Sequence, residues 1–128
     1  MRRLVVSMAV AAAAMLPGTV LAQGGDPAAG QRVFNQCRAC HTSEQGGRNG
    51  VGPNLWGIVG RRAASIEGFR YSANMRELAE GGLTWTEDRL RAYLTNPKDL
   101  VPRGTMAFAG IRNPEQLNNL IAYLNTLK

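Results

Sequence analysis

The sequence of 128 residues is poor in the side chains that most often bind metal ions or form cross-links, with two cysteines and one histidine. A tetrahedral zinc site takes four protein ligands, or three and a water molecule. Such a site would therefore need a remote carboxylate here. A disulfide between cysteines three residues apart would close a very small loop, where the entropic gain is least and strain is expected. The sequence also lacks internal repeats, low-complexity linkers and a second domain, which indicates one small domain.

These scarce residues all lie in one segment, Cys37-Arg38-Ala39-Cys40-His41. C-x-x-C-H is the attachment sequence of c-type haem. Positions three apart share a face of a helical turn, so both thiols can form thioethers to the porphyrin, and the following imidazole can bind the iron. A thioredoxin-like redox pair is an alternative, but it is expected in a βαβ setting and no strand pattern surrounds this segment. The segment predicts one covalent haem c, attached through Cys37 and Cys40, with His41 as an axial ligand.

The long apolar run of the sequence lies near the N-terminus, where two arginines precede a stretch rich in alanine and valine. A basic start, a short apolar core and a small-residue site at 20–22 are typical of a secretory signal peptide. The run is too short to span a membrane comfortably, and an uncleaved anchor is the alternative. We predict a signal peptide over residues 1–22 and a mono-haem domain over 23–128. The mature protein is then expected in the periplasm, without stable insertion in the membrane.

Removal of residues 1–22 leaves 13 basic and nine acidic residues, a mild formal charge of +4. This charge suits docking on the acidic faces of redox partner proteins. The basic residues are scattered along the sequence, which disfavours binding to nucleic acid, as does the export signal. We expect a monomer.

Capping residues indicate four helices. The helices are expected to begin after Asp26, Ser72, Thr86 and Asn113. The second should end at Glu80, before two glycines, and the third near Asn96, before a proline. The last helix carries an apolar stripe at helical spacing, typical of a helix that packs on the core, here on the first helix. The stripe consists of Leu117, Leu120, Ile121 and Leu124.

Residues 42–71 show neither a helical nor a strand period and contain many glycines. A long irregular loop is unusual in a small domain. Loops wrapped around a large flat apolar cofactor can, however, bury their side chains on it, and glycine permits a close approach of the backbone. The pattern therefore predicts an all-α domain whose loops enclose the haem.

A second axial ligand has two candidates in the predicted mature chain, Met75 and Met106. A thioether suits haem iron, although methionine more often fills gaps in a core. Met75 lies in an expected helix and is interpreted as packing. Met106 lies in a loop shaped by proline and glycine between two helices, which can present a side chain to the metal opposite His41. Spacing favours Met106.

The predicted mature chain resembles class I cytochromes c, the small bacterial mono-haem proteins, over nearly its whole length. The matching segments are Gly30–Phe34, Cys37–His41, Gly52–Leu55, Gly60-Arg61, Gly68–Ser72, Leu83–Trp85, Tyr93-Leu94, Asn96–Lys98, Met106–Gly110 and Leu120–Leu124. Their order and spacing make the resemblance far more specific than the five-residue motif. The early position of the haem motif excludes a four-helix-bundle cytochrome.

The resemblance implies an all-α fold in which the N- and C-terminal helices cross. Gly30 would allow them to approach, and Phe34 and Tyr123 would pack at the crossing. Pro53 would present its carbonyl to the ring N–H of His41 and hold its orientation; otherwise it only forms a turn.

The resemblance also implies roles for aromatic and basic residues around the haem. Arg61, Tyr71 and Trp85 resemble the residues that hold the propionates; otherwise they are a solvated charge and core aromatics. Tyr93 resembles the tyrosine that hydrogen-bonds the methionine sulfur, and Phe108 the aromatic residue over the exposed haem edge. Basic positions near that edge are matched by Lys98, Arg48 and Arg112, each of which could be only a surface charge.

One segment departs from the family. Its usual P-G-T-K-M is Pro102-Arg103-Gly104-Thr105-Met106 here. The length is kept, so Met106 still aligns as the ligand. The glycine and the threonine are displaced by one position, which puts the hydrogen bond of the threonine to a propionate in doubt. The basic residue also moves from before the methionine to after the proline.

These features predict an electron-transfer protein rather than an enzyme. With both axial positions filled, iron has no easy site for a substrate and can exchange one electron through the ring edge. The leading hypothesis is a periplasmic carrier between a donor dehydrogenase or membrane complex and an oxidase or reductase. The alternatives are a dedicated haem subunit of one periplasmic dehydrogenase, or a ligand-binding sensor or peroxidase if Met106 is not a stable ligand.

Overall fold

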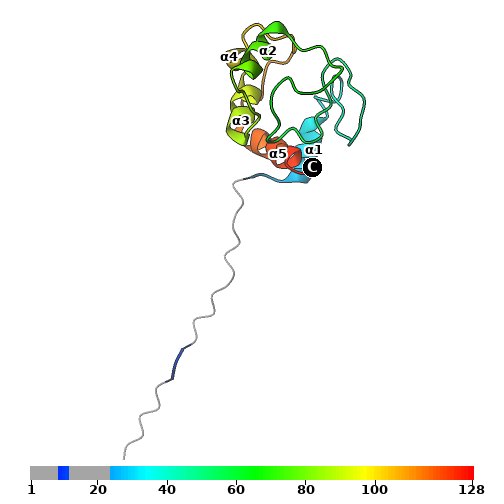
Figure 1. The fold of residues 1–128 in the computed structure, drawn as a ribbon. Helices are drawn as coiled ribbons and strands as arrows, with labels where there is room; N and C mark the ends of the chain where they lie inside the picture. The colour runs from blue at the N-terminus through cyan, green and yellow to red at the C-terminus, as the bar shows by residue number, and fades with distance from the viewer. Residues whose placement is uncertain (1–8, 12–23) are drawn as a thin grey trace, which may run out of the picture.

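A computed structural model describes residues 9–11 and 24–128 of the chain (Figure 1). Apart from residues 9–11, the expected signal peptide and its cleavage before Gln23 lie outside the described residues. The described part is all-α, as predicted, with five helices and one isolated bridge between Arg62 and Thr84. The helices are α1 (Pro27–Phe34), α2 (Ala73–Glu80), α3 (Glu87–Thr95), α4 (Pro97–Leu100) and α5 (Pro114–Leu124). None of these helices combines the length and apolar character needed to cross a membrane.

The four expected helices begin where their capping residues placed them. Each cap side chain accepts a hydrogen bond from a backbone N–H in the first turn, which would otherwise lack a partner. The caps are Asp26, Ser72, Thr86 and Asn113. Two of these helices also begin with a proline, whose missing N–H costs nothing at that position.

The short helix α4 was not predicted from the sequence. Asn96 is extended, with φ −152° and ψ 95°, so α3 ends before it. The residue before a proline is pushed out of the helical region, whereas the proline itself suits a first helical position. Pro97 therefore both ends α3 and opens α4.

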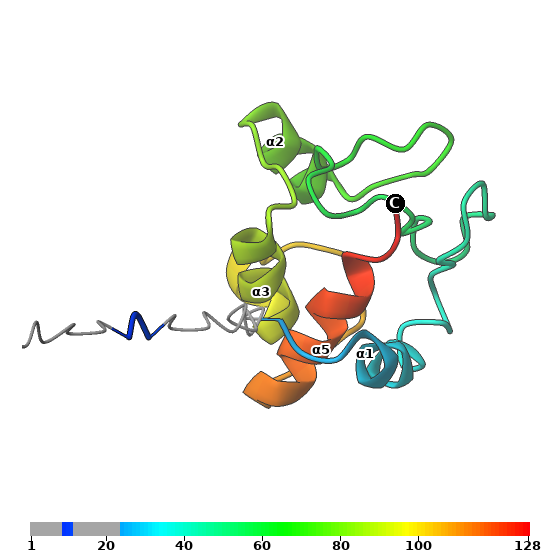
Figure 2. The same ribbon diagram turned by 90° about the horizontal axis from the view of Figure 1, so that it is seen from below.

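The terminal helices α1 and α5 cross, as the resemblance implied (Figure 2). Gly30 is buried at the crossing, where a Cβ atom would lie 1.8 Å from the carbonyl oxygen of Asn119. Beside it, the rings of Phe34 and Tyr123 pack with their centroids 5.2 Å apart. The absence of a side chain at Gly30 thus lets two backbones meet and holds the N-terminal haem motif against the C-terminal helix.

The core extends from this crossing toward α3. The apolar stripe of α5 is buried, and Trp85 and Leu90 are buried at either side of the α3 cap. Residues 41–72 contain no helix and no named strand, in agreement with the lack of a period in the sequence. In Figure 1 this loop region runs between the α1–α5 crossing and α2, which lies at the opposite end of the domain.

Candidate functional site

The cysteines lie directly after α1, in a series of turns that continue its direction. The N–H groups of Cys40 and His41 both donate to the carbonyl of Cys37, at 3.1 and 2.9 Å. This local winding places positions 37 and 40 one turn apart, the geometry required of two tethers on one face. Both thiols are free and partly buried, without a disulfide between them. Burial raises the pKa of the Cys37 thiol to about 11, and electrostatic interaction with Cys40 contributes less to the same shift.

The His41 ring is fixed by Gly52 and Pro53, which follow it closely in the sequence. Its Nδ1 lies 2.6 Å from the carbonyl oxygen of Pro53. Gly52 lies so close to the ring that a Cβ atom there would be 2.3 Å from Cε1. Since Nδ1 donates its proton to the carbonyl, Nε2 keeps a free lone pair. Burial lowers the pKa of His41, and the Pro53 hydrogen bond partly opposes that shift.

This arrangement matches what a haem iron requires of a proximal ligand. A metal-binding histidine commonly donates its second ring nitrogen to a carbonyl, which fixes both tautomer and orientation. Two thiols one turn apart and a neutral, oriented imidazole together fit a covalent haem. They do not form a zinc site with other side chains, because in the described part of the chain no three His, Cys, Asp or Glu residues gather as metal ligands do.

Asn54 is a structural centre of the loop that follows His41, and sequence reasoning gave it no role. Its Nδ2 donates to Thr42 Oγ1 at 2.7 Å and to the carbonyl of Glu44 at 2.9 Å. Its own N–H donates to Asn49 Oδ1 at 2.9 Å. A buried amide with several partners rigidifies the backbone around it. An asparagine within an otherwise apolar Gly-Pro-Asn-Leu segment was the only signal in the sequence.

Arg61, Tyr71 and Trp85 come from three separate segments, of which the first and the last are joined by a backbone hydrogen bond. The N–H of Trp85 donates to the carbonyl of Arg61 at 2.8 Å. The Arg61 guanidinium donates to the carbonyls of Asn54 and Trp56, at 2.9 and 3.0 Å. Burial lowers the pKa of Arg61 while electrostatic interaction with Tyr71 raises it. A half-buried guanidinium is suited to hold a carboxylate such as a propionate.

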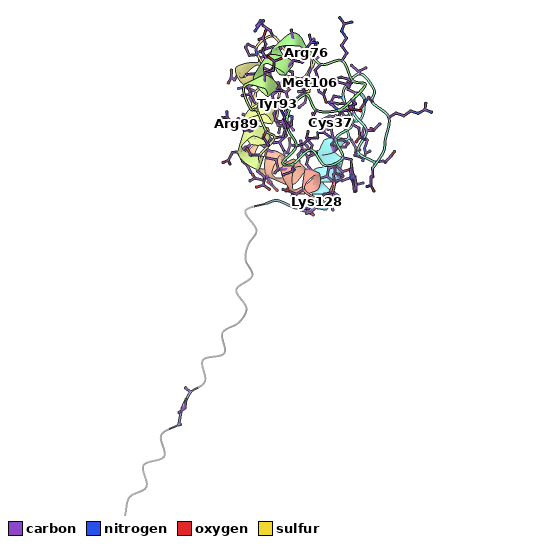
Figure 3. All side chains as sticks on the ribbon, in the orientation of Figure 1. Cys37, Arg76, Arg89, Tyr93, Met106 and Lys128 are labelled. Carbon is purple, nitrogen blue, oxygen red and sulfur yellow. The ribbon has the colours of Figure 1, made fainter. Side chains whose placement is uncertain are left out.

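Helix α3 presents Tyr93 toward the loop of Met106. The Tyr93 hydroxyl lies 3.9 Å from Met106 Sδ. Its ring lies against buried Trp85, with centroids 4.9 Å apart. Burial raises the pKa of Tyr93 to about 12, so the phenol keeps its proton and can donate it toward the sulfur. Figure 3 labels Tyr93, Met106 and Cys37 within the folded domain.

The other candidates are placed as follows. Met75 packs against the hydrophobic core, as the sequence suggested, and Phe108 is half-buried against the same core. Lys98 donates to the carbonyl of Gly104 at 2.7 Å rather than pointing freely into solvent. Arg48 and Arg112 are exposed. In Figure 3 three further basic residues, Arg76, Arg89 and Lys128, lie at separate points around the domain, without a single basic cluster among them.

Comparisons with known proteins agree with this geometry. The family model described as cytochrome c matches residues 27–128. A cytochrome c2 of Afifella marina is 46% identical over 105 residues, which cover 81% of this chain and 85% of that protein. One of Blastochloris viridis is 42% identical over 125 residues, covering 97% of this chain and 92% of its own. The solved structure of cytochrome cH from Methylobacterium extorquens has a TM-score of 0.72 and 42% identity, and covers 80% of this chain and 99% of that one.

Proposed function

Because this chain belongs to the cytochrome c family, we propose that it is a periplasmic one-electron carrier whose haem iron is ligated by His41 and Met106. As a member of this family, the chain is an electron-transfer protein, not an enzyme, and it binds one covalent haem c through its cysteine pair. We further propose that the mature domain spans residues 23–128 and that it exchanges electrons with partner proteins in the periplasm.

The observation that carries the ligand assignment is the contact between Tyr93 and Met106. A protonated phenol 3.9 Å from a thioether sulfur orients that sulfur and lowers its electron donation. Met75, the competing methionine, instead packs against the core. On the other side, the Pro53 carbonyl orients the His41 ring so that Nε2 is free to bind.

The bound haem supplies the one-electron couple, and the residues of the chain adjust it. His41 and Met106 would both bind the iron, which would leave no position open for a substrate. Arg61 and Tyr71 stabilise the negative propionates, and burial by Trp85 and Tyr93 excludes water, which disfavours the more highly charged ferric state. Partner proteins with acidic faces would dock briefly on the mildly basic surface, and the carrier would act as a monomer.

Optical spectroscopy of the purified holoprotein tests the ligand set. Ferric c-type haem has a weak far-red absorption band when a thioether sulfur is bonded to the iron. We expect this band in the natural protein and in Met75→Ala, and its loss in Met106→Ala. The reduced Met106→Ala protein should bind CO rapidly, whereas the natural protein should resist it. A band that survives Met106→Ala would refute the assignment.

A further inference from the structure

The loop that carries Met106 begins with a tight turn over Val101, Pro102, Arg103 and Gly104. The N–H of Gly104 donates to the carbonyl of Val101 at 3.0 Å, which closes the turn. Pro102 occupies the second position, where its fixed φ is favourable. In such a turn the N–H of the third residue has no partner within the turn. The backbone N–H of Arg103 is therefore available to a neighbouring element.

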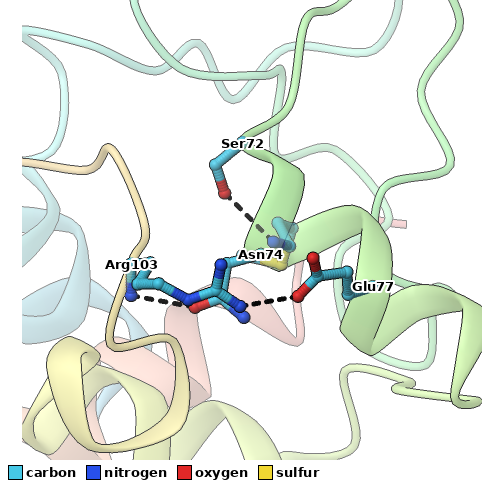
Figure 4. Close-up of polar contacts among 5 residues, drawn as sticks. Ser72, Asn74, Glu77 and Arg103 are labelled. Carbon is cyan, nitrogen blue, oxygen red and sulfur yellow. Dashed lines mark hydrogen bonds and ion pairs between the residues drawn. The ribbon is translucent and has the colours of Figure 1, made fainter.

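Helix α2 binds both the backbone and the side chain of Arg103 (Figure 4). The Arg103 N–H donates to Asn74 Oδ1 at 2.8 Å. The Arg103 guanidinium lies 2.7 Å from Glu77 Oε2. Asn74 and Glu77 are three residues apart and thus share one face of α2. The backbone and the side chain of Arg103 are therefore both held by one face of α2.

The two contacts differ in how much they stabilise the attachment of Arg103 to α2. The side chains of Arg103 and Glu77 are 67% and 56% exposed, so solvent weakens their attraction and the pair contributes little. Asn74 is only 6% exposed, and its bond to a backbone N–H is shielded from water. Loss of a buried partner leaves a polar group unsatisfied, which is more costly than loss of a surface ion pair. Asn74 is therefore the main attachment.

This attachment lies three residues before Met106 in the chain. Lys98 of α4 also donates to the carbonyl of Gly104 at 2.7 Å, so the turn is held from two helices. Beyond Gly104, the thioether reaches the Tyr93 hydroxyl. The displaced basic residue that distinguishes this chain from the usual P-G-T-K-M pattern is the one that contacts α2.

We propose that Asn74, through Arg103, is a positioning residue that holds the Met106 loop against α2 and so keeps the thioether on the haem iron. The inference rests on the ligand assignment of the proposed function. Asn74 touches neither haem nor sulfur in this role. It restricts the opening of the loop, and opening is the step that would expose the iron to an external ligand.

Titration of the ferric holoprotein with imidazole, followed by loss of the far-red band, measures that opening. Imidazole binds only when the thioether has left, so its apparent affinity reports the population of the open loop. In Asn74→Ala we expect an affinity about fivefold higher, the factor that corresponds to one buried hydrogen bond. The serine of Asn74→Ser is too short to reach Arg103, so this variant should show the same rise in imidazole affinity. It replaces Asn74→Ala in the experiment if the alanine variant does not fold. Asn74→Asp keeps the acceptor oxygen and should restore an affinity near that of the natural protein.

Three further variants complete the comparison. Glu77→Gln removes only the exposed ion pair and should raise the affinity about twofold or less. Glu80→Gln is the matched control, an exposed carboxylate on the same helix, and should change nothing. Met106→Ala gives the affinity of an open position.

The outcomes separate the inference from its premise. An Asn74→Ala protein that binds imidazole like the natural one, while Met106→Ala binds it far more tightly, overturns the inference and leaves the ligand assignment standing. A larger effect of Glu77→Gln than of Asn74→Ala also overturns it, because the ion pair would then be the main attachment. A natural protein without the far-red band, which binds imidazole as Met106→Ala does, overturns the ligand assignment and the inference together. A purely structural role for Asn74 would lower the unfolding temperature without changing the imidazole affinity of the folded protein.

Discussion

Substitution of Gly30 by alanine should destabilise the protein, although helix propensity by itself predicts the opposite. Alanine in a helix interior is favoured over glycine by about 1 kcal/mol. At Gly30, however, the added Cβ would lie 1.8 Å from the carbonyl oxygen and 2.5 Å from the carbonyl carbon of Asn119. These are backbone atoms of α5, so no rotation of a side chain can relieve the overlap. The two helices would have to separate.

The size of the effect follows from these opposing contributions. Overpacking of a tight core costs about 1–3 kcal/mol, and overlap with the backbone belongs at or above the upper end. After the gain in helix propensity is subtracted, we expect a net loss of about 2 kcal/mol in the free energy of unfolding. For a domain of this size, that loss lowers the melting temperature by about 10 °C.

Thermal and guanidinium unfolding of the holoprotein, followed by far-ultraviolet circular dichroism, measures the difference. Gln31→Ala is the matched control, because Gln31 is exposed on the same helix and its loss should change stability by about 0.5 kcal/mol or less. A Gly30→Ala protein as stable as the natural one, or more stable, would show that the crossing tolerates a methyl group and would refute the close backbone contact.

Three other predictions concern the haem environment and the start of the mature chain. Gly52→Ala would place a Cβ 2.3 Å from Cε1 of His41, so we expect the free energy of unfolding of the holoprotein to fall by about 1–3 kcal/mol in guanidinium titrations; an unchanged midpoint would contradict this. Tyr93→Phe removes the hydrogen-bond donor to the Met106 sulfur. The sulfur then donates more electron density to the iron, and this favours the ferric state. The reduction potential should fall by a few tens of millivolts in a redox titration, since about 60 mV corresponds to a tenfold change in a one-electron equilibrium; a rise would reverse the argument. Intact-mass analysis of the exported protein should give a polypeptide that begins at Gln23 and carries one haem, whereas retention of residues 1–22 would indicate an anchor.

Buried and half-buried polar residues show how the haem environment is held in shape. Asn54 satisfies its amide within the loop after His41, and Arg61 donates to two carbonyls of the same region. Tyr123 of α5 donates to buried Ser43, two residues beyond His41. Each of these contacts fixes a stretch of irregular backbone. A glycine-rich loop needs such contacts because it lacks the regular backbone hydrogen bonds of a helix or a sheet.

Sequence patterns predicted the parts of the fold that depend on near neighbours. A cap is recognised by a side chain two or three residues from the N–H that it binds, as at Ser72 and Thr86. The stripe of α5 follows from helical geometry alone. The helix α4 was missed because proline is usually a stop, and only the path of the chain after Asn96 shows that Pro97 also begins a helix.

By itself, the sequence determined that this protein binds a covalent haem c, because the two thiols and the imidazole lie within five residues and their spacing is a local property. The tertiary structure decided which methionine meets Tyr93, and that Arg103 reaches Asn74 and Glu77 across 29 and 26 residues. No local pattern encodes such contacts. They depend on the packing of elements distant in sequence, such as the crossing of α1 and α5, because that packing fixes the position of each side chain.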